Sequence, residues 1–172
     1  MTVLVWITEA TWPACVDAAR VRAARVHAAP DGIALLHVSD DEVAAAAHRA
    51  YAGLLGRGHR PDRDPGVRLE ALARPAAADL LEAAAHRLGR PCVFLEHHGR
   101  VEHEVVRAAA GAELLICARD GEPGRPGPRS LGRATRFVVD HAECPVLLVW
   151  PYGEETPVPP EPLVPPGSGG WA

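Results

Sequence analysis

The fold is decided by a segment that begins with Glu113-Leu-Leu-Ile-Cys-Ala-Arg-Asp-Gly121 and ends with Val146-Leu-Leu-Val-Trp150. Residues 114–117 form a short apolar run bounded by turn residues, which is typical of a strand buried on both faces. Glycines at positions 121, 124 and 127 follow, and they allow the backbone to turn sharply and to approach a ligand closely. This half of the segment therefore predicts a strand that leads into a glycine-rich loop.

The second half of the segment predicts a helix and a further strand. Ser130 is a favourable N-cap for a helix that runs to His141, and Pro145 ends that helix before the apolar run 146–150. A loop that brings a helix N-terminus beside a strand end is an arrangement that receives phosphate. The segment as a whole predicts strand, loop, helix and strand, with an anion site at the loop.

The residues His141-Ala-Glu-Cys-Pro-Val146 carry a family resemblance. This ending resembles the C-terminal half of universal stress proteins, which close with a His-Ala-x-Cys-Pro-Val strand after a Gly-x2-Gly-x9-Gly-(Ser/Thr) loop. Aligned from the ending, the loop positions fall on Ala118, Gly121, Gly132 and Arg133, with ten residues between the two glycines. An alanine thus replaces the first glycine, an arginine replaces the hydroxyl residue, and one residue is inserted.

Length and composition describe an ordinary globular protein. The 172 residues allow one domain of about 150 residues and a tail, with 48% apolar residues and a net charge of −4. This charge balance recruits neither nucleic acid nor a membrane, and all the basic residues are arginine. Four widely spaced cysteines without a Cys-x-x-Cys pair predict buried, reduced thiols. The chain shows no signal peptide and no long apolar run, so we expect a cytoplasmic protein.

Strands and helices are predicted to alternate along the whole chain. Apolar runs predict strands at 3–7, 33–38, 92–96, 114–117 and 146–150, and helical patterns cover 13–29, 39–54, 69–88, 101–110 and 130–141. A Ser39-x-x-Glu42 capping box opens the second helix, a loop covers 56–66, and Pro75 is expected to kink or restart the third helix.

This alternation predicts an α/β fold with a parallel sheet that is covered by helices on both faces. The family resemblance implies a doubly wound, Rossmann-like sheet of five strands in the order 3-2-1-4-5. In that order the crevice for a ligand lies between the C-terminal ends of the first and fourth strands. The predicted domain covers residues 1–152, and the tail 153–172 is too rich in proline and glycine to form regular structure.

The resemblance also implies the residues of a nucleotide site. Thr8 takes the position of an aspartate that holds the nucleoside, and Val38 takes a position beside the adenine. The remaining candidates follow from the loop and the start of the helix after it: Ala118, Arg119, Gly121, Gly132, Arg133 and Ala134. The ligand implied is ATP or another adenine nucleotide, bound without a metal of the protein's own. Arginines at 119, 125, 129, 133 and 136 suit phosphate recognition, whereas prolines at 123, 126 and 128 remove backbone donors.

Two other clusters predict no chemistry of their own. His97, His98 and His103 straddle a turn and match no metal-ligand spacing, so we interpret them as surface residues. Cys117 lies near Arg119, an environment that can lower the pKa of a thiol, but no paired base accompanies it.

The function implied by the resemblance is that of a bacterial universal stress protein, a stress-responsive binding module without turnover. Weak ATP hydrolysis stays open. We expect a homodimer joined through the apolar edge strand 146–150, and an unidentified protein partner stays open. One alternative is a nucleotide-free homodimer that acts only through such a partner. Another is a nucleotide-hydrolysing or thiol enzyme on the same sheet, although the sequence has no Walker lysine and no triad.

Overall fold

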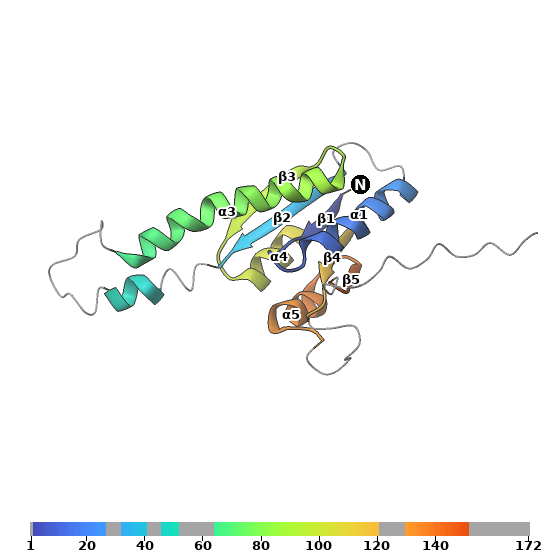
Figure 1. Ribbon diagram of the computed structural model, residues 1–172. Helices are drawn as coiled ribbons and strands as arrows, with labels where there is room; N and C mark the ends of the chain where they lie inside the picture. The colour runs from blue at the N-terminus through green and yellow to red at the C-terminus, as the bar shows by residue number, and fades with distance from the viewer. Residues whose placement is uncertain (1, 27–31, 41–45, 52–63, 121–129, 152–172) are drawn as a thin grey trace, which may run out of the picture.

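A computed structural model describes residues 2–26, 32–40, 46–51, 64–120 and 130–151 (Figure 1). Within these residues the elements are β1 (Val3–Trp6), α1 (Trp12–Val26), β2 (Ile33–Ser39), α3 (Pro65–Leu88), β3 (Val93–His98), α4 (Val101–Ala109), β4 (Leu114–Ala118), α5 (Arg133–His141) and β5 (Val146–Val149). Residues 46–51 are also helical.

The five strands form one parallel sheet in the order β3-β2-β1-β4-β5. The predicted order 3-2-1-4-5 is therefore confirmed. β1 lies at the centre, with Val5 paired to Leu35 on one side and to Ile116 on the other. β2 and β3 are added on one side of β1, and β4 and β5 on the other, so the order switches between β1 and β4. In a doubly wound fold the ligand crevice lies at the C-terminal ends of the two strands at this switch point.

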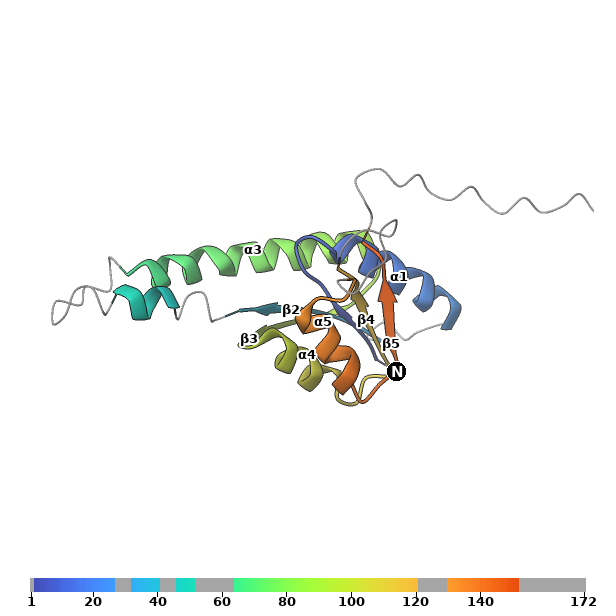
Figure 2. The same ribbon diagram turned by 90° about the horizontal axis from the view of Figure 1, so that it is seen from below.

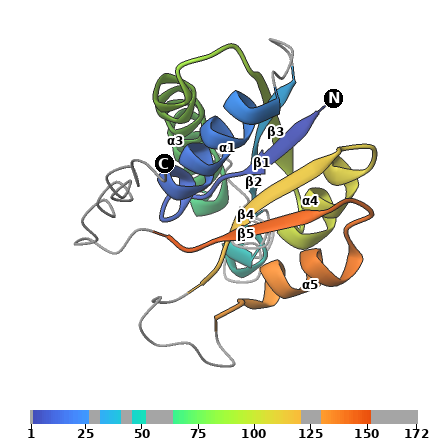
Figure 3. The ribbon, with the colours of Figure 1, turned by 90° about the vertical axis from the view of Figure 1, so that its right-hand side faces the viewer.

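Helices cover both faces of the sheet, with α1 and α3 on one face and α4 and α5 on the other (Figure 3). Alternate side chains of β1 serve the two faces: Val3 and Val5 join the core beneath α1 and α3, whereas Leu4 and Trp6 join the core beneath α4 and α5. All four are buried. Such a strand has no polar face, which explains its uninterrupted apolar sequence.

α3 differs from the prediction. It begins at Pro65, inside the expected loop 56–66, and continues without a break through Pro75 to Leu88. Asp64 is its N-cap and accepts a hydrogen bond from the Gly66 N–H at 2.8 Å. The 24 residues span about 36 Å, so the N-terminal half of α3 projects past the sheet, where it lies beside residues 46–51 (Figure 2).

Other element boundaries shift by a few residues. β3 starts later than predicted and extends to His98, so His97 and His98 lie in a strand rather than in a turn. α5 begins at Arg133, and Ser130 is not its N-cap. The expected end of the first helix at Ala29, the Glu42 of the capping box and the tail 153–172 lie outside the described residues.

No helix among the described ranges combines the length and the apolar character needed to cross a membrane. The four cysteines are free thiols, with Cys15 and Cys117 buried and Cys92 and Cys144 partly buried.

Candidate functional site

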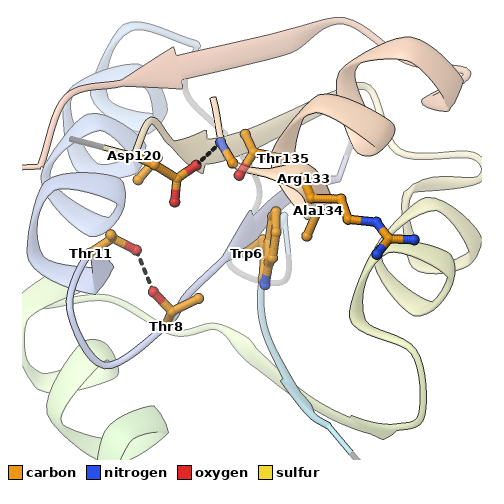
Figure 4. A pocket seen from close by; sticks show the side chains of 9 residues that line it. Trp6, Thr8, Thr11, Asp120, Arg133, Ala134 and Thr135 are labelled. Carbon is orange, nitrogen blue, oxygen red and sulfur yellow. Dashed lines mark hydrogen bonds between the residues drawn. The ribbon is translucent and has the colours of Figure 1, made fainter. Parts of the chain in front are cut away.

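A cavity of about 220 Å³ lies where β1 and β4 end (Figure 4). The residues that line it come from the end of β1 and the turn after it, from the end of β4, and from the first turn of α5: Trp6, Thr8, Thr11, Ala118, Asp120, Gly132, Arg133, Ala134 and Thr135. Thr11 directly precedes α1 and Gly132 directly precedes α5. The N-termini of two helices therefore direct their positive dipole ends toward one cavity. In α1 the Trp12 N–H already donates to Thr8 O and Pro13 has no N–H, so backbone donors for an anion come from α5.

Five of the eight residues predicted from the sequence meet at this cavity: Thr8, Ala118, Gly132, Arg133 and Ala134. Two others lie elsewhere. Val38 is buried in the core beneath α4 and α5 and does not line the cavity, and Arg119 is turned away from it. Gly121 lies outside the described residues, as do Arg125 and Arg129.

The position of Arg119 corrects the expectation that it would attract a phosphate. Its guanidinium carbon lies 4.7 Å from the centre of the Trp150 ring, and its Nη2 donates to Ser130 Oγ at 3.1 Å. Cation–π contact and this hydrogen bond hold the side chain over the end of β5. Arg133 is exposed, and its guanidinium points away from Thr8, Thr11 and Asp120 (Figure 4). The arginines of the described residues therefore do not surround the cavity.

Asp120 is the main residue that the sequence did not single out. Its carboxylate accepts a hydrogen bond from the Gly132 N–H at the start of α5, and its own N–H donates to the carbonyl of Ser130 at 3.0 Å. Asp120 thereby supplies the N-terminal hydrogen bond that Ser130 was expected to supply. The residue is separated from Gly132 by twelve positions, and only the meeting of β4 with α5 brings the two together.

The wall formed by β1 and the turn after it also contains two residues that motif reasoning missed, Trp6 and Thr11. Thr8 Oγ1 and Thr11 Oγ1 are 2.7 Å apart, and Thr8 O accepts from the N–H groups of Thr11 and Trp12. Trp6 is buried and also lines the cavity (Figure 4). Its position at the end of the first strand could have indicated a cavity residue, but the sequence analysis interpreted Trp6 only as part of the strand.

The buried thiols do not suit nucleophilic chemistry. Burial raises the pKa of Cys117 to about 12, and the negative charge of Asp120 adds to this effect. Burial also raises the pKa of Cys15 to about 12, with a smaller contribution from Cys117. Since the thiolate is the nucleophile, both residues are inert near neutral pH, and the lowered pKa considered for Cys117 is not found.

The histidines of β3 and α4 form no metal centre. His97 Nδ1 lies 3.1 Å from Glu104 Oε2, and His98 Nε2 lies 3.8 Å from Glu96 Oε1. His103 instead contacts the ring of Phe137, with centroids 5.0 Å apart. Over the described ranges no three His, Cys, Asp or Glu residues gather as metal ligands.

Comparison with known proteins gives structural likeness only. No protein-family model matches the sequence, and no curated protein matches it significantly. Among solved structures, the hypothetical protein MJ0577 superposes with a TM-score of 0.61 at 18% identity, covering 88% of this chain and 97% of that one. A universal stress protein in complex with cAMP superposes with a TM-score of 0.54 at 17% identity, covering 88% of this chain and 98% of its own.

A universal stress protein family protein from Arabidopsis thaliana, with AMP bound, gives a TM-score of 0.50 at 21% identity, covering 91% of this chain and 97% of that one. The strand order, the helices on both faces and the near-complete coverage agree with one another. The chain therefore has the fold of the universal stress proteins.

Proposed function

We propose that the chain acts as a universal stress protein, a cytoplasmic regulatory module that binds a phosphate-bearing ligand without turning it over. The observation that carries the proposal is the cavity at the ends of β1 and β4, where the N-termini of α1 and α5 converge. Cavities at this point of a doubly wound sheet are the usual ligand sites of the fold. The bound cAMP and AMP of two structural neighbours favour an adenine nucleotide as the ligand class.

Several features of the cavity favour weak binding. A volume of about 220 Å³ is below the roughly 300–1,000 Å³ of typical ligand pockets. Thr8, Ala118 and Arg133 replace an aspartate, a glycine and a hydroxyl residue of the family pattern. Each lost hydrogen bond costs about 1 kcal/mol or more, so together these changes weaken ATP binding roughly a hundredfold.

Calorimetric titration with ATP, GTP and pyrophosphate tests the proposal. We expect weak binding of all three at low salt and a marked loss at moderate salt, because the positive ends of the helix dipoles, which salt screens, rather than a nucleoside pocket supply the affinity. Thr8→Val and Thr11→Val should weaken binding further, whereas Thr2→Val, an exposed change at the other end of β1, should have no effect. Micromolar, adenine-selective binding that survives salt would show that the site is intact. No heat with any ligand would favour the nucleotide-free alternative.

We also propose that the chain is a homodimer joined through β5, with or without a ligand, and one observation favours this assembly. β5 is an edge strand that pairs only with β4 within the described residues, and Leu147 on it is 38% exposed. An apolar edge strand exposes unpaired backbone groups and invites another strand. Pairing of two β5 strands would cover both the backbone groups and Leu147, and it is compatible with a ligand in the cavity.

Leu147→Arg is expected to convert the dimer into a monomer, because the charge would have to be buried without a partner at the joint between the two sheets. Sedimentation of wild type at tens of micromolar should give the dimer mass. Val93→Arg is a matched control, since Val93 is 45% exposed on β3 at the opposite edge of the same sheet. If only the Val93 variant lost the dimer, the interface would lie at the β3 edge. A monomeric wild type would exclude the dimer altogether.

A further inference from the structure

The N-terminus of α5 already holds a negatively charged group. The carboxylate of Asp120 accepts the Gly132 N–H, which is one of the four backbone donors that a helix leaves free at its start. This is the position that a phosphate takes when it binds at a helix N-terminus. Asp120 leaves β4 at the rim of the cavity and points toward α5 (Figure 4).

Gly132 is shaped for this contact. A Cβ at position 132 would lie 2.7 Å from Asp120 Oδ2 and 2.9 Å from Asp120 Cγ, so any larger residue there would force the carboxylate to move. The carboxylate therefore occupies the space beside the Cα of Gly132. In the aligned family loop this glycine belongs to the phosphate cradle, and here its space is filled by the chain's own anion.

We propose that Asp120 is an internal occupant of the phosphate subsite and that it sets the low affinity of the cavity for phosphate. This inference rests on the proposed function, since it concerns the same cavity. An incoming phosphate must displace the carboxylate from Gly132 and must then bind next to its charge. Among the described residues no arginine forms an ion pair with Asp120, and Arg119 and Arg133 both point elsewhere. The repulsion is therefore not offset by a neighbouring cation in those parts of the chain.

The test compares pyrophosphate and ATP binding to the full chain and to three variants by calorimetry at low salt. Asp120→Ala removes both the charge and the acceptor, and we expect its affinity for pyrophosphate to rise at least about tenfold. Asp120→Asn keeps an acceptor for Gly132 without the charge, so its affinity should rise less. Asp79→Asn is the control, because Asp79 is exposed on α3 and its replacement gives the same change in net charge. That variant should bind as wild type does.

A second measurement does not depend on ligand. The backbone amide resonance of Gly132 should move in Asp120→Ala and stay in place in Asp79→Asn, since only the first change removes its hydrogen-bond partner. Thermal unfolding of each variant identifies any loss of fold, and Asp120→Asn preserves the test if Asp120→Ala is unstable.

The outcomes separate the two proposals. Wild-type binding that Asp120→Ala and Asp120→Asn leave unchanged would overturn this inference and leave the proposed function in place. Tight binding by Asp120→Ala with none by wild type would support the inference and overturn the function as a phosphate-binding module. No binding by any variant would overturn both.

Discussion

Replacing Asp64 with alanine is expected to lower the free energy of unfolding by roughly 3 kcal/mol. Asp64 is 2% exposed, and its two carboxylate oxygens serve different partners: Oδ1 accepts from the Gly66 N–H at 2.8 Å, and Oδ2 lies 2.7 Å from His48 Nδ1. The substitution removes the N-cap of α3 and also the link to residues 46–51. It leaves the buried Gly66 N–H without this acceptor, which is the costly case, whereas the His48 ring is 33% exposed.

Urea denaturation at a fixed protein concentration measures the effect. Asp64→Asn should lose less, because one oxygen remains to accept from Gly66, and Asp79→Asn on the exposed side of α3 should change little. Hydrogen exchange should show lower protection in residues 46–51 and in the first turn of α3, while β1 stays protected. Asp64→Ala with wild-type stability and exchange would show that this contact does not hold the projecting half of α3.

The second large effect concerns alkaline pH. Burial raises the pKa of Cys15 and of Cys117 from 9.0 to about 12 in the native protein, whereas both thiols ionise near their ordinary pKa when the chain unfolds. The native state therefore holds these protons where the unfolded state loses them. Stability that is fully present below pH 9 is lost as pH rises toward 12, by up to about 1.4 kcal/mol per pH unit for each thiol.

Unfolding free energies at several values between pH 8 and pH 11 test this expectation, and the absence of lysine removes the commonest other group that titrates there. Cys15→Ala and Cys117→Ala should each reduce the slope, whatever cavity cost they add at pH 8. Cys144→Ala is the control, because its thiol is only partly buried and its pKa is raised less. If the change of unfolding free energy with pH were the same in wild type and in the variant that carries both Cys15→Ala and Cys117→Ala, these thiols would not be its source.

Local sequence pattern was enough to predict most of the elements. An apolar run needs no knowledge of its neighbours to indicate a buried strand, and β1, β2 and β4 were found within one or two residues of their bounds. The order of the strands could not be predicted from local pattern, because alternation of strand and helix allows several doubly wound orders. The order came from the resemblance of residues 141–146, and the structure confirmed it.

Local rules failed where a distant group competed with a near one. Ser130 is the better N-cap by sequence, but Asp120 reaches the start of α5 because β4 ends beside it. Pro75 was expected to kink or restart the third helix, and no restart is found, since α3 runs from Pro65 to Leu88 without a break.

The sequence by itself determined that this is a parallel α/β protein, because strands alternate with helices along the chain. The crevice after the first and fourth strands and its candidate residues came from the family resemblance, and five of them line one cavity: Thr8, Ala118, Gly132, Arg133 and Ala134. Only the tertiary structure decided which side chains face the cavity. The direction of a side chain depends on the packing of neighbouring elements. This packing places the Arg119 guanidinium over the Trp150 ring and the Asp120 carboxylate beside the Gly132 N–H.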